Sequence, residues 1–281
     1  MDVAAILSKI AETANRDDLI FPTTTQMALK VQRVLDDPDC SVSQLAKLVQ
    51  SDPLLATRVV AVANSVIYNR SGRVIDDPKS AVSRIGFNTL RALAAAVVVR
   101  QMEGMASTPE HRQLAVRLWE HTAHVAALAQ VIAHRVTHVN PDTAFFAGII
   151  HEVGGFYLIS RAKDYPGLLE GKDGSLLAWD EGGAAEVGRA VLQRLSAPAA
   201  VVAAIEGLWA GYLAMPPQSL ADTLLLADQL APVESPLSQL AGTGREGTEA
   251  NIEVALDDET LSSILEESTA DVASMIDALR A

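Results

Sequence analysis

The stretch from Ala144 to Gly155 reads AFFAGIIHEVGG, and the interpretation of the whole chain starts from it. It is an apolar run that ends in the pair His151–Glu152 and a double glycine. Several hydrolases hold a divalent metal ion with an imidazole beside a carboxylate at the end of such a helix. We predict a helix over the apolar run and a turn at the double glycine, and we ask which partners the pair would have.

The bulk composition indicates a helical protein with a large core. Of the 281 residues 49% are hydrophobic and only 4% aromatic, so small apolar side chains dominate and favour close helix packing. The formal net charge of −13 argues against a general nucleic-acid binder, because phosphate contacts depend on clustered Lys and Arg. The single Cys40 excludes an intrachain disulfide and fits a reducing compartment.

The hydropathy pattern gives no indication of a membrane protein. There is no run of about 18 uninterrupted apolar residues, and no basic leader precedes the first apolar residues. We therefore expect no membrane segment and a cytoplasmic location.

Start and stop signals divide the chain into helices. Ser41 with Gln44 is typical of a capping box, Asp52 precedes a proline at a helix start, and Gly86 is typical of the position after a helix end. Together with a break at Phe21–Pro22, these signals predict about five short helices in the first hundred residues. Further helices are predicted over 109–132, from 141, and over 184–195, 198–212 and 219–230. Because no segment alternates strictly, we predict an all-α fold.

Changes in composition predict the boundaries of the parts. We expect an N-terminal helical extension over 1–20, a main domain over 21–230 with lobes 21–105 and 106–230, a linker over 231–256, and an acidic amphipathic helix over 257–281. The apolar face of that last helix needs a cover. Docking on its own core is the commoner outcome for so short a helix, and pairing with a second copy in a homodimer is the alternative.

Several short motifs occur together in this order. They are Asp52-Pro53 with Leu55 and Arg58, Ala63-Asn64-Ser65 with Tyr68, Ile85-Gly86 with Leu90-Arg91, Leu118-Trp119 with His121, Phe146 and Gly148 with His151, and Ala185-Glu186-Val187-Gly188. On these residues the chain, over roughly 20 to 230, resembles the HDOD domain, an offshoot of the HD phosphohydrolase superfamily. The resemblance implies an all-α bacterial protein linked to signal transduction. It also implies a five-helix N-terminal lobe packed on a degenerate HD-type lobe.

The resemblance also implies where a metal ion would bind. Catalytic HD proteins use a His, a His–Asp pair and a later Asp, and the match carries these roles to His121, His151, Glu152 and Asp228. Glu152 stands where Asp is expected, which moves the carboxylate by about a bond length, while metal–ligand distances tolerate only ~0.2 Å.

Other ligands of the family are missing from this chain. Ala184 or Ala185 stands where binuclear relatives place a further His, and Glu206-Gly207-Leu208-Trp209 stands where another His is usual. We therefore expect a vestigial site with no catalysis, no cofactor and no metal. If an ion did bind, the four residues carried over above would be its ligands.

Each of these residues also has a purely structural interpretation. His121 could be a core histidine with a satisfied N–H, and His151 and Glu152 could hydrogen-bond each other and end the helix.

A second set of motif residues could form a recognition surface. It consists of Asn64, Ser65, Tyr68 and Arg91. Since Asn and Ser also end helices by bonding to the backbone, we favour turn chemistry for this set.

Three functions follow from these patterns. We favour a non-catalytic regulatory module that acts through a protein partner in a signalling pathway. The second is a metal-dependent phosphohydrolase acting on a nucleotide or cyclic dinucleotide. The third is a small-ligand sensor that uses the vacated metal cavity.

Overall fold

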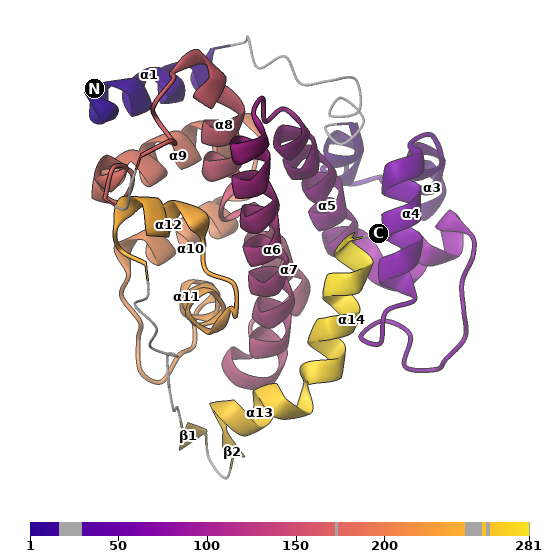
Figure 1. Ribbon diagram of the computed structural model, residues 1–281. Coiled ribbons are helices and arrows are strands. Elements are labelled where there is room, and N and C mark those ends of the chain that lie inside the picture. The colour runs from indigo at the N-terminus through magenta and orange to yellow at the C-terminus, as the bar shows by residue number, and fades with distance from the viewer. Residues whose placement is uncertain (17–29, 172–173, 245–254, 257–258, 281) are drawn as a thin grey trace.

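The protein is described by a computed structural model, which places residues 1–16, 30–171, 174–244, 255–256 and 259–280. The fold is built from packed helices (Figure 1), which confirms the all-α prediction. The predicted break at Phe21–Pro22 lies outside the described residues.

The elements follow one another along the chain with short connections. The α-helices are α1 (Val3–Asn15), α3 (Val42–Gln50), α4 (Pro53–Ala63), α5 (Pro78–Gly104), α6 (Pro109–Ile132), α7 (Pro141–Ile150), α8 (Val153–Arg161), α9 (Ala184–Arg194), α10 (Ala199–Ala210), α11 (Leu220–Leu230), α12 (Pro236–Ala241), α13 (Leu261–Glu267) and α14 (Thr269–Arg280). Residues 30–35 are helical as well. Short 3-10 or π-helical segments are η1 (Ala133–Thr137), η2 (Ala162–Asp164) and η3 (Trp179–Gly183), and β1 (Ala255–Leu256) pairs antiparallel with β2 (Glu259–Thr260).

The caps that start the helices of the N-terminal lobe are those that the sequence predicts. At α3 the Ser41 hydroxyl accepts the Gln44 N–H, and the Gln44 side chain accepts the Ser41 N–H. Asp52 caps α4 in front of the proline at its first turn. Gly86 has φ +78°, which favours glycine, and it bends α5 between two helical segments. These helices form the lobe at the right of Figure 1.

Helices α6 and α7 lie together at the centre of the molecule (Figure 1). Their close approach requires a glycine, because a Cβ atom on Gly148 would lie 2.5 Å from the Cα of Ala126. Phe145 and Ile149 of α7 are fully buried in the same core. This pair of helices is the scaffold on which the residues discussed below are arranged.

The predicted turn at Gly154–Gly155 is wrong. Both glycines lie in the first turn of α8, and the chain breaks instead at His151–Glu152. A Cβ atom on Gly154 would lie 2.9 Å from the Cα of Gly188 in α9. The glycine therefore serves close packing between two helices, a role that the sequence alone does not distinguish from a turn.

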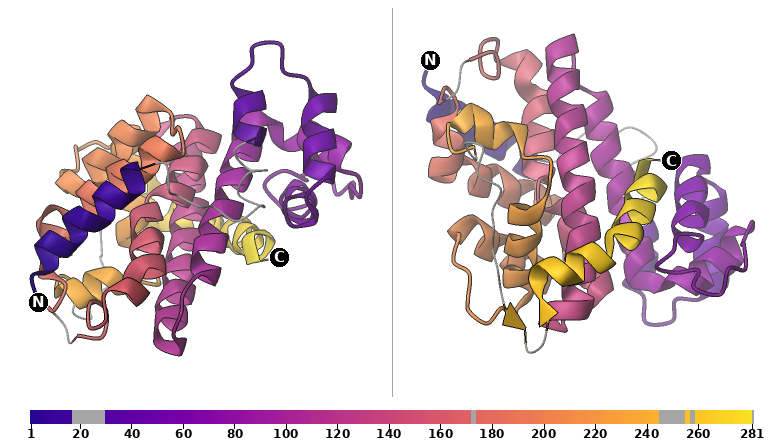
Figure 2. Two further views of the ribbon diagram at one scale, coloured as in Figure 1. Left: turned by 90° about the horizontal axis from the view of Figure 1, so that it is seen from above. Right: turned by 60° about the horizontal axis from the view of Figure 1, so that its bottom comes forward.

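Both ends of the chain pack on other parts of the molecule. Helix α1 packs on α9 and α8. Helix α14 lies against α6 of one lobe and α4 of the other (Figure 2), with Met275 and Leu279 fully buried. The single helix expected over 257–281 is thus two helices that meet at Ser268, and the apolar face is covered by the chain's own core.

The segment expected to be a linker, 231–256, contains a helix. Six of its residues form α12, and Leu237 in that helix is fully buried. Ser235 and a proline at the first position start the helix, but six residues are too few to show a periodic pattern.

Two apolar stretches, Pro78–Gly104 and Pro141–Asp164, are long and apolar enough to cross a membrane. However, 67% and 89% of their apolar windows are buried inside the fold. They are positioned as the core helices of a soluble helical domain.

Candidate metal site

Three ligand atoms from distant parts of the sequence meet in the HD-like lobe. His121 comes from the middle of α6, His151 from the end of α7 and Asp228 from α11. The Nε2 atoms of the two histidines are 3.1 Å apart, and Nε2 of His121 is 3.3 Å from Oδ1 of Asp228. All three ligand atoms lie within 4.8 Å of one another. We call this set the His–His–Asp cluster.

Backbone carbonyls orient both imidazole rings. Nδ1 of His121 is 2.8 Å from the carbonyl oxygen of Val233, and Nδ1 of His151 is 2.7 Å from that of Gly148. A carbonyl oxygen only accepts hydrogen bonds, so each Nδ1 carries its hydrogen. Both Nε2 atoms therefore face the cluster, which is the orientation that backbone carbonyls impose on metal-binding histidines.

The His–His–Asp cluster fits one divalent ion. Ligand atoms about 2.1 Å from a tetrahedral ion lie roughly 3.3 Å from one another, and the distances of 3.1 and 3.3 Å are close to that value. Two imidazoles and one carboxylate suit zinc, iron or manganese. An ion held there would polarise a bound oxygen atom.

A proton can close the same cluster. Burial lowers the pKa of His121, but the hydrogen bond to Asp228 and the charges of Asp228 and Glu152 outweigh burial and raise it. Burial, followed by the charge of His121, lowers the pKa of His151 to about 4. At neutral pH a protonated His121 therefore donates through Nε2 to the neutral ring of His151.

Glu152 lies beside the cluster and is not part of it. It lines the same cavity as His151 and Asp228, but its Oε2 atom packs over α8, 2.9 Å from where a Cβ on Gly155 would be. Burial raises the pKa of Glu152. A hydrogen bond between His151 and Glu152, the structural alternative considered above, does not form, since both ring nitrogens of His151 have other partners.

The cavity next to the cluster is acidic. It has a volume of about 440 Å³, and four carboxylates line it: Glu152, Asp180, Glu181 and Asp228. No Lys or Arg is among the lining residues in the described part of the chain. Ala184 and Ala185 also line it, so the positions that would supply further ligands hold methyl groups. A negatively charged phosphate ester would find no counter-charge on these walls.

Three residues of the motif surface have structural partners. The Asn64 carboxamide donates to the carbonyl of Ile75 at 2.6 Å and accepts its N–H at 2.9 Å. The Ser65 hydroxyl donates to the Val62 carbonyl at 2.7 Å. Arg91, on the surface of α5, pairs with Asp36 at 2.7 Å.

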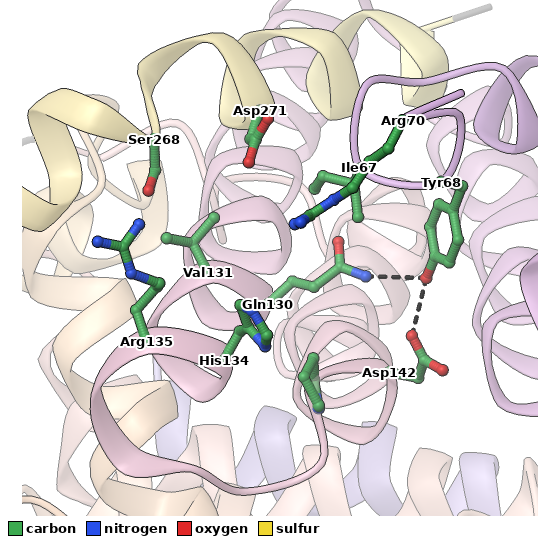
Figure 3. A pocket seen from close by; sticks show the side chains of 11 residues that line it. Ile67, Tyr68, Arg70, Gln130, Val131, His134, Arg135, Asp142, Ser268 and Asp271 are labelled. Atoms are coloured by element: carbon green, nitrogen blue, oxygen red, sulfur yellow. Dashed lines mark hydrogen bonds between the residues drawn. The ribbon is translucent and has the colours of Figure 1, made fainter. Parts of the chain in front are cut away.

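Tyr68 has a different role from its neighbours in the motif. Its hydroxyl lies 2.8 Å from each of three side chains, Thr89 of α5, Gln130 of α6 and Asp142 of α7 (Figure 3). It therefore joins the N-terminal lobe to the central helices. Sequence reasoning missed Gln130 and Asp142, because they reach Tyr68 only through the fold and no local motif marks them.

Comparison with known proteins gives a consistent result. The family model described as HDOD domain matches residues 21–208. An uncharacterized protein from Treponema pallidum (strain Nichols) is 26% identical over 160 residues, which span 57% of this chain and 29% of that protein. The chain thus matches less than a third of the length of this curated relative.

Solved structures share the fold. A protein from Shewanella amazonensis SB2B, named "Putative metal-dependent phosphohydrolase", has a TM-score of 0.65 at 23% identity and covers 99% of this chain and 100% of its own. An HDOD domain protein with unknown function from Geobacter sulfurreducens has a TM-score of 0.61 at 20% identity, with 99% and 97% covered. A "Putative signal transduction protein" from Marinobacter aquaeolei VT8 has a TM-score of 0.55 at 18% identity, with 99% and 65% covered.

Proposed function

Because the chain belongs to the HDOD domain family, we propose that it is a non-catalytic regulatory module that acts through a protein partner in a bacterial signalling pathway, in the cytoplasm. One observation carries the non-catalytic part of this proposal. The cavity beside the His–His–Asp cluster is lined by four carboxylates and, within the described chain, by no Lys or Arg. Hydrolysis of a phosphate ester requires cations that hold the phosphoryl oxygens.

The cluster itself supports a second candidate, a metal-dependent phosphohydrolase. Its three ligand atoms would hold one ion with open coordination positions. The missing ligands at Ala184 and Ala185 weigh against a second ion and an activated water between two metals. This candidate therefore ranks below the regulatory module. A ligand sensor in the same cavity would have to take a cationic molecule, since the walls are acidic.

An activity assay separates these two candidates. The purified protein, loaded with Mn²⁺, Fe²⁺ or Zn²⁺, is incubated with bis(p-nitrophenyl) phosphate and with cyclic dinucleotides. We expect no turnover above that of the His151→Ala variant. His124→Ala is the matched control, since His124 lies one turn from His121 on α6 and its Nδ1 is bonded to the carbonyl of Glu120. Turnover that His151→Ala loses and His124→Ala keeps would establish the phosphohydrolase instead.

A genetic experiment tests the regulatory part. Deletion of the gene should change the transcript profile of the organism. Wild-type protein and the His151→Ala variant should restore the profile equally, because the cluster is not required for contact with a partner. Failure of a stably folded His151→Ala protein to restore the profile would contradict the proposal.

A further inference from the structure

A second cavity lies where three parts of the molecule meet. It has a volume of about 300 Å³ and lies between the loop after α4, the end of α6, and the start of α14 (Figure 3). Ile67 and Arg70 line it from the loop, Gln130 and Val131 from α6, and Asp271 from α14. None of these residues belongs to the acidic cavity beside the His–His–Asp cluster. We call this second cavity the interlobe pocket.

The hydroxyl of Tyr68 fixes the orientation of Gln130. Tyr68 has one hydrogen, and Asp142 can only accept it when ionised, so the hydroxyl donates to Asp142. The hydroxyl must then accept from Gln130, which places the NH₂ group of Gln130 toward Tyr68 at 2.8 Å. The carboxamide oxygen of Gln130 is thereby turned the other way.

That oxygen is a buried acceptor without a partner in the described structure. Gln130 is only 3% exposed, and its Oε1 atom receives no hydrogen bond from the described residues. Figure 3 shows the oxygen pointing away from Tyr68, into the space framed by Ile67, Arg70 and Asp271. A buried acceptor left unpaired costs about 1–3 kcal/mol. A donor supplied by a ligand in the interlobe pocket would recover this cost.

The other walls provide groups of two further kinds. Arg70 is exposed and its guanidinium group reaches into the pocket, while Arg135 lines it on the other side. Arg135 also pairs with Glu267, at 3.0 Å, and this contact ties α13 to η1. Ile67 and Val131 add apolar surface, and Asp271 adds a carboxylate. The pocket thus combines cations for an anionic group, acceptors for N–H or O–H donors, and an apolar wall.

We propose that the interlobe pocket binds a nucleoside monophosphate. Such a ligand uses every group described. The phosphate would pair with the guanidinium groups of Arg70 and Arg135, and an exocyclic amine of the base would donate to Gln130. The base would rest on the apolar side chains, and the ribose hydroxyls would donate to Asp271, as they do to acidic residues in nucleotide sites. The volume of about 300 Å³ is at the lower end of small-molecule sites and suits one nucleotide.

Binding there would also stabilise the docked C-terminal helices. The pocket includes Ser268 and Asp271 at the start of α14, together with residues of both lobes. A ligand that contacts all three parts favours the state in which α14 is docked between α4 and α6. This consequence provides a readout that does not depend on enzymatic activity.

Calorimetric titration of the full chain with AMP, GMP, CMP and UMP tests the proposal. We expect one saturable site for at least one of the three nucleotides with an exocyclic amine, and binding of UMP weaker by at least about ten-fold. Adenosine, which lacks the phosphate, should bind at least about ten-fold more weakly than AMP. Hydrogen exchange in residues 261–280 should slow on addition of the bound nucleotide.

Two pairs of variants locate the site. Gln130→Met should weaken binding at least about ten-fold, whereas Gln32→Met should not, although Gln32 is also buried with an unpaired Oε1. Arg70→Ala removes an exposed side chain and leaves the fold intact, so its effect on binding is informative even if Gln130→Met fails to fold. Arg73→Ala, which removes another exposed arginine of the same loop, is its control.

Two results would overturn the proposal. If none of the four nucleotides binds up to about 5 mM, water alone satisfies the Gln130 oxygen and the pocket is not a nucleotide site. Binding that is unchanged in both Gln130→Met and Arg70→Ala would place the nucleotide elsewhere. Neither result bears on the absence of phosphohydrolase activity, which is assayed separately.

Discussion

The acidic cavity and the interlobe pocket are built on the same two helices but have opposite chemistry. Helix α6 contributes His121 to the first and Gln130 to the second, nine residues or about 13 Å further along the axis. Helix α7 contributes His151 at its end to the first, and Asp142 near its start lines the second. Both cavities therefore depend on one rigid scaffold.

The difference between the cavities comes from the elements around that scaffold. Helix α11 and η3 bring carboxylates to the first, while the loop after α4 and η1 bring arginines to the second. A carboxylate cavity attracts a metal ion or a proton, and an arginine-lined pocket attracts an anion. The shared helices set where a ligand can bind, and the surrounding segments determine its charge.

The largest effect is expected from a substitution in the shared scaffold. Gly148→Ala places a Cβ atom 2.5 Å from the backbone of Ala126, so α6 and α7 must move apart. Overpacking of this kind costs about 3 kcal/mol. Urea unfolding should show this loss, and both nucleotide binding and the geometry of the His–His–Asp cluster should be impaired together.

The matched control for this substitution is Gly104→Ala at the end of α5, where a Cβ atom meets nothing within 4 Å. It should leave stability unchanged or raise it by up to about 1 kcal/mol, since alanine favours the helix. Equal stability of the two variants would show that α6 and α7 are not tightly coupled at Gly148, and the two cavities would then not share one scaffold.

Local signals in the sequence were sufficient for most of the helices. The capping box at Ser41 and the cap at Asp52 fix two helix starts because they act over three or four residues. The double glycine at 154–155 was misread, because its reason is the distant Gly188. A glycine that permits close packing and a glycine that makes a turn look alike until the partner helix is known.

The candidate sites divide in the same way. His121, His151 and Asp228 were found because the family motif contains them, and the structure brings their ligand atoms together. Gln130 and Asp271 were not found. They belong to segments far apart in the sequence, and the reason to notice Gln130 is an unpaired oxygen, which only the hydrogen-bond network reveals.

A smaller effect, confined to the interlobe pocket, is expected from Tyr68→Phe. Burial, followed by the charge of Asp142, raises the pKa of Tyr68, so the hydroxyl stays protonated and continues to donate. Its removal leaves Asp142, Gln130 and Thr89 without this partner, and we expect a loss of about 2 kcal/mol in urea unfolding.

The variant should also weaken nucleotide binding, because the Gln130 amide is then free to turn. Tyr212→Phe is the control, since Tyr212 is 78% exposed and should be neutral. If the two variants bind the nucleotide equally, Tyr68 does not orient Gln130 and the argument for the buried acceptor is lost.

The smallest effect is expected in the acidic cavity, on removal of divalent cations. Dialysis against EDTA should change the melting temperature by less than about 1 °C, because the proton between His121 and His151 closes the cluster without an ion. An ion present at a hundred times its Kd would instead contribute about 2.7 kcal/mol, which corresponds to roughly 5–10 °C for a chain of this size. Elemental analysis of the same sample before and after dialysis identifies what is released. A drop of that size with one equivalent of released metal would make the acidic cavity an occupied metal centre, and the contrast between the two cavities would then be one of bound cation against bound anion.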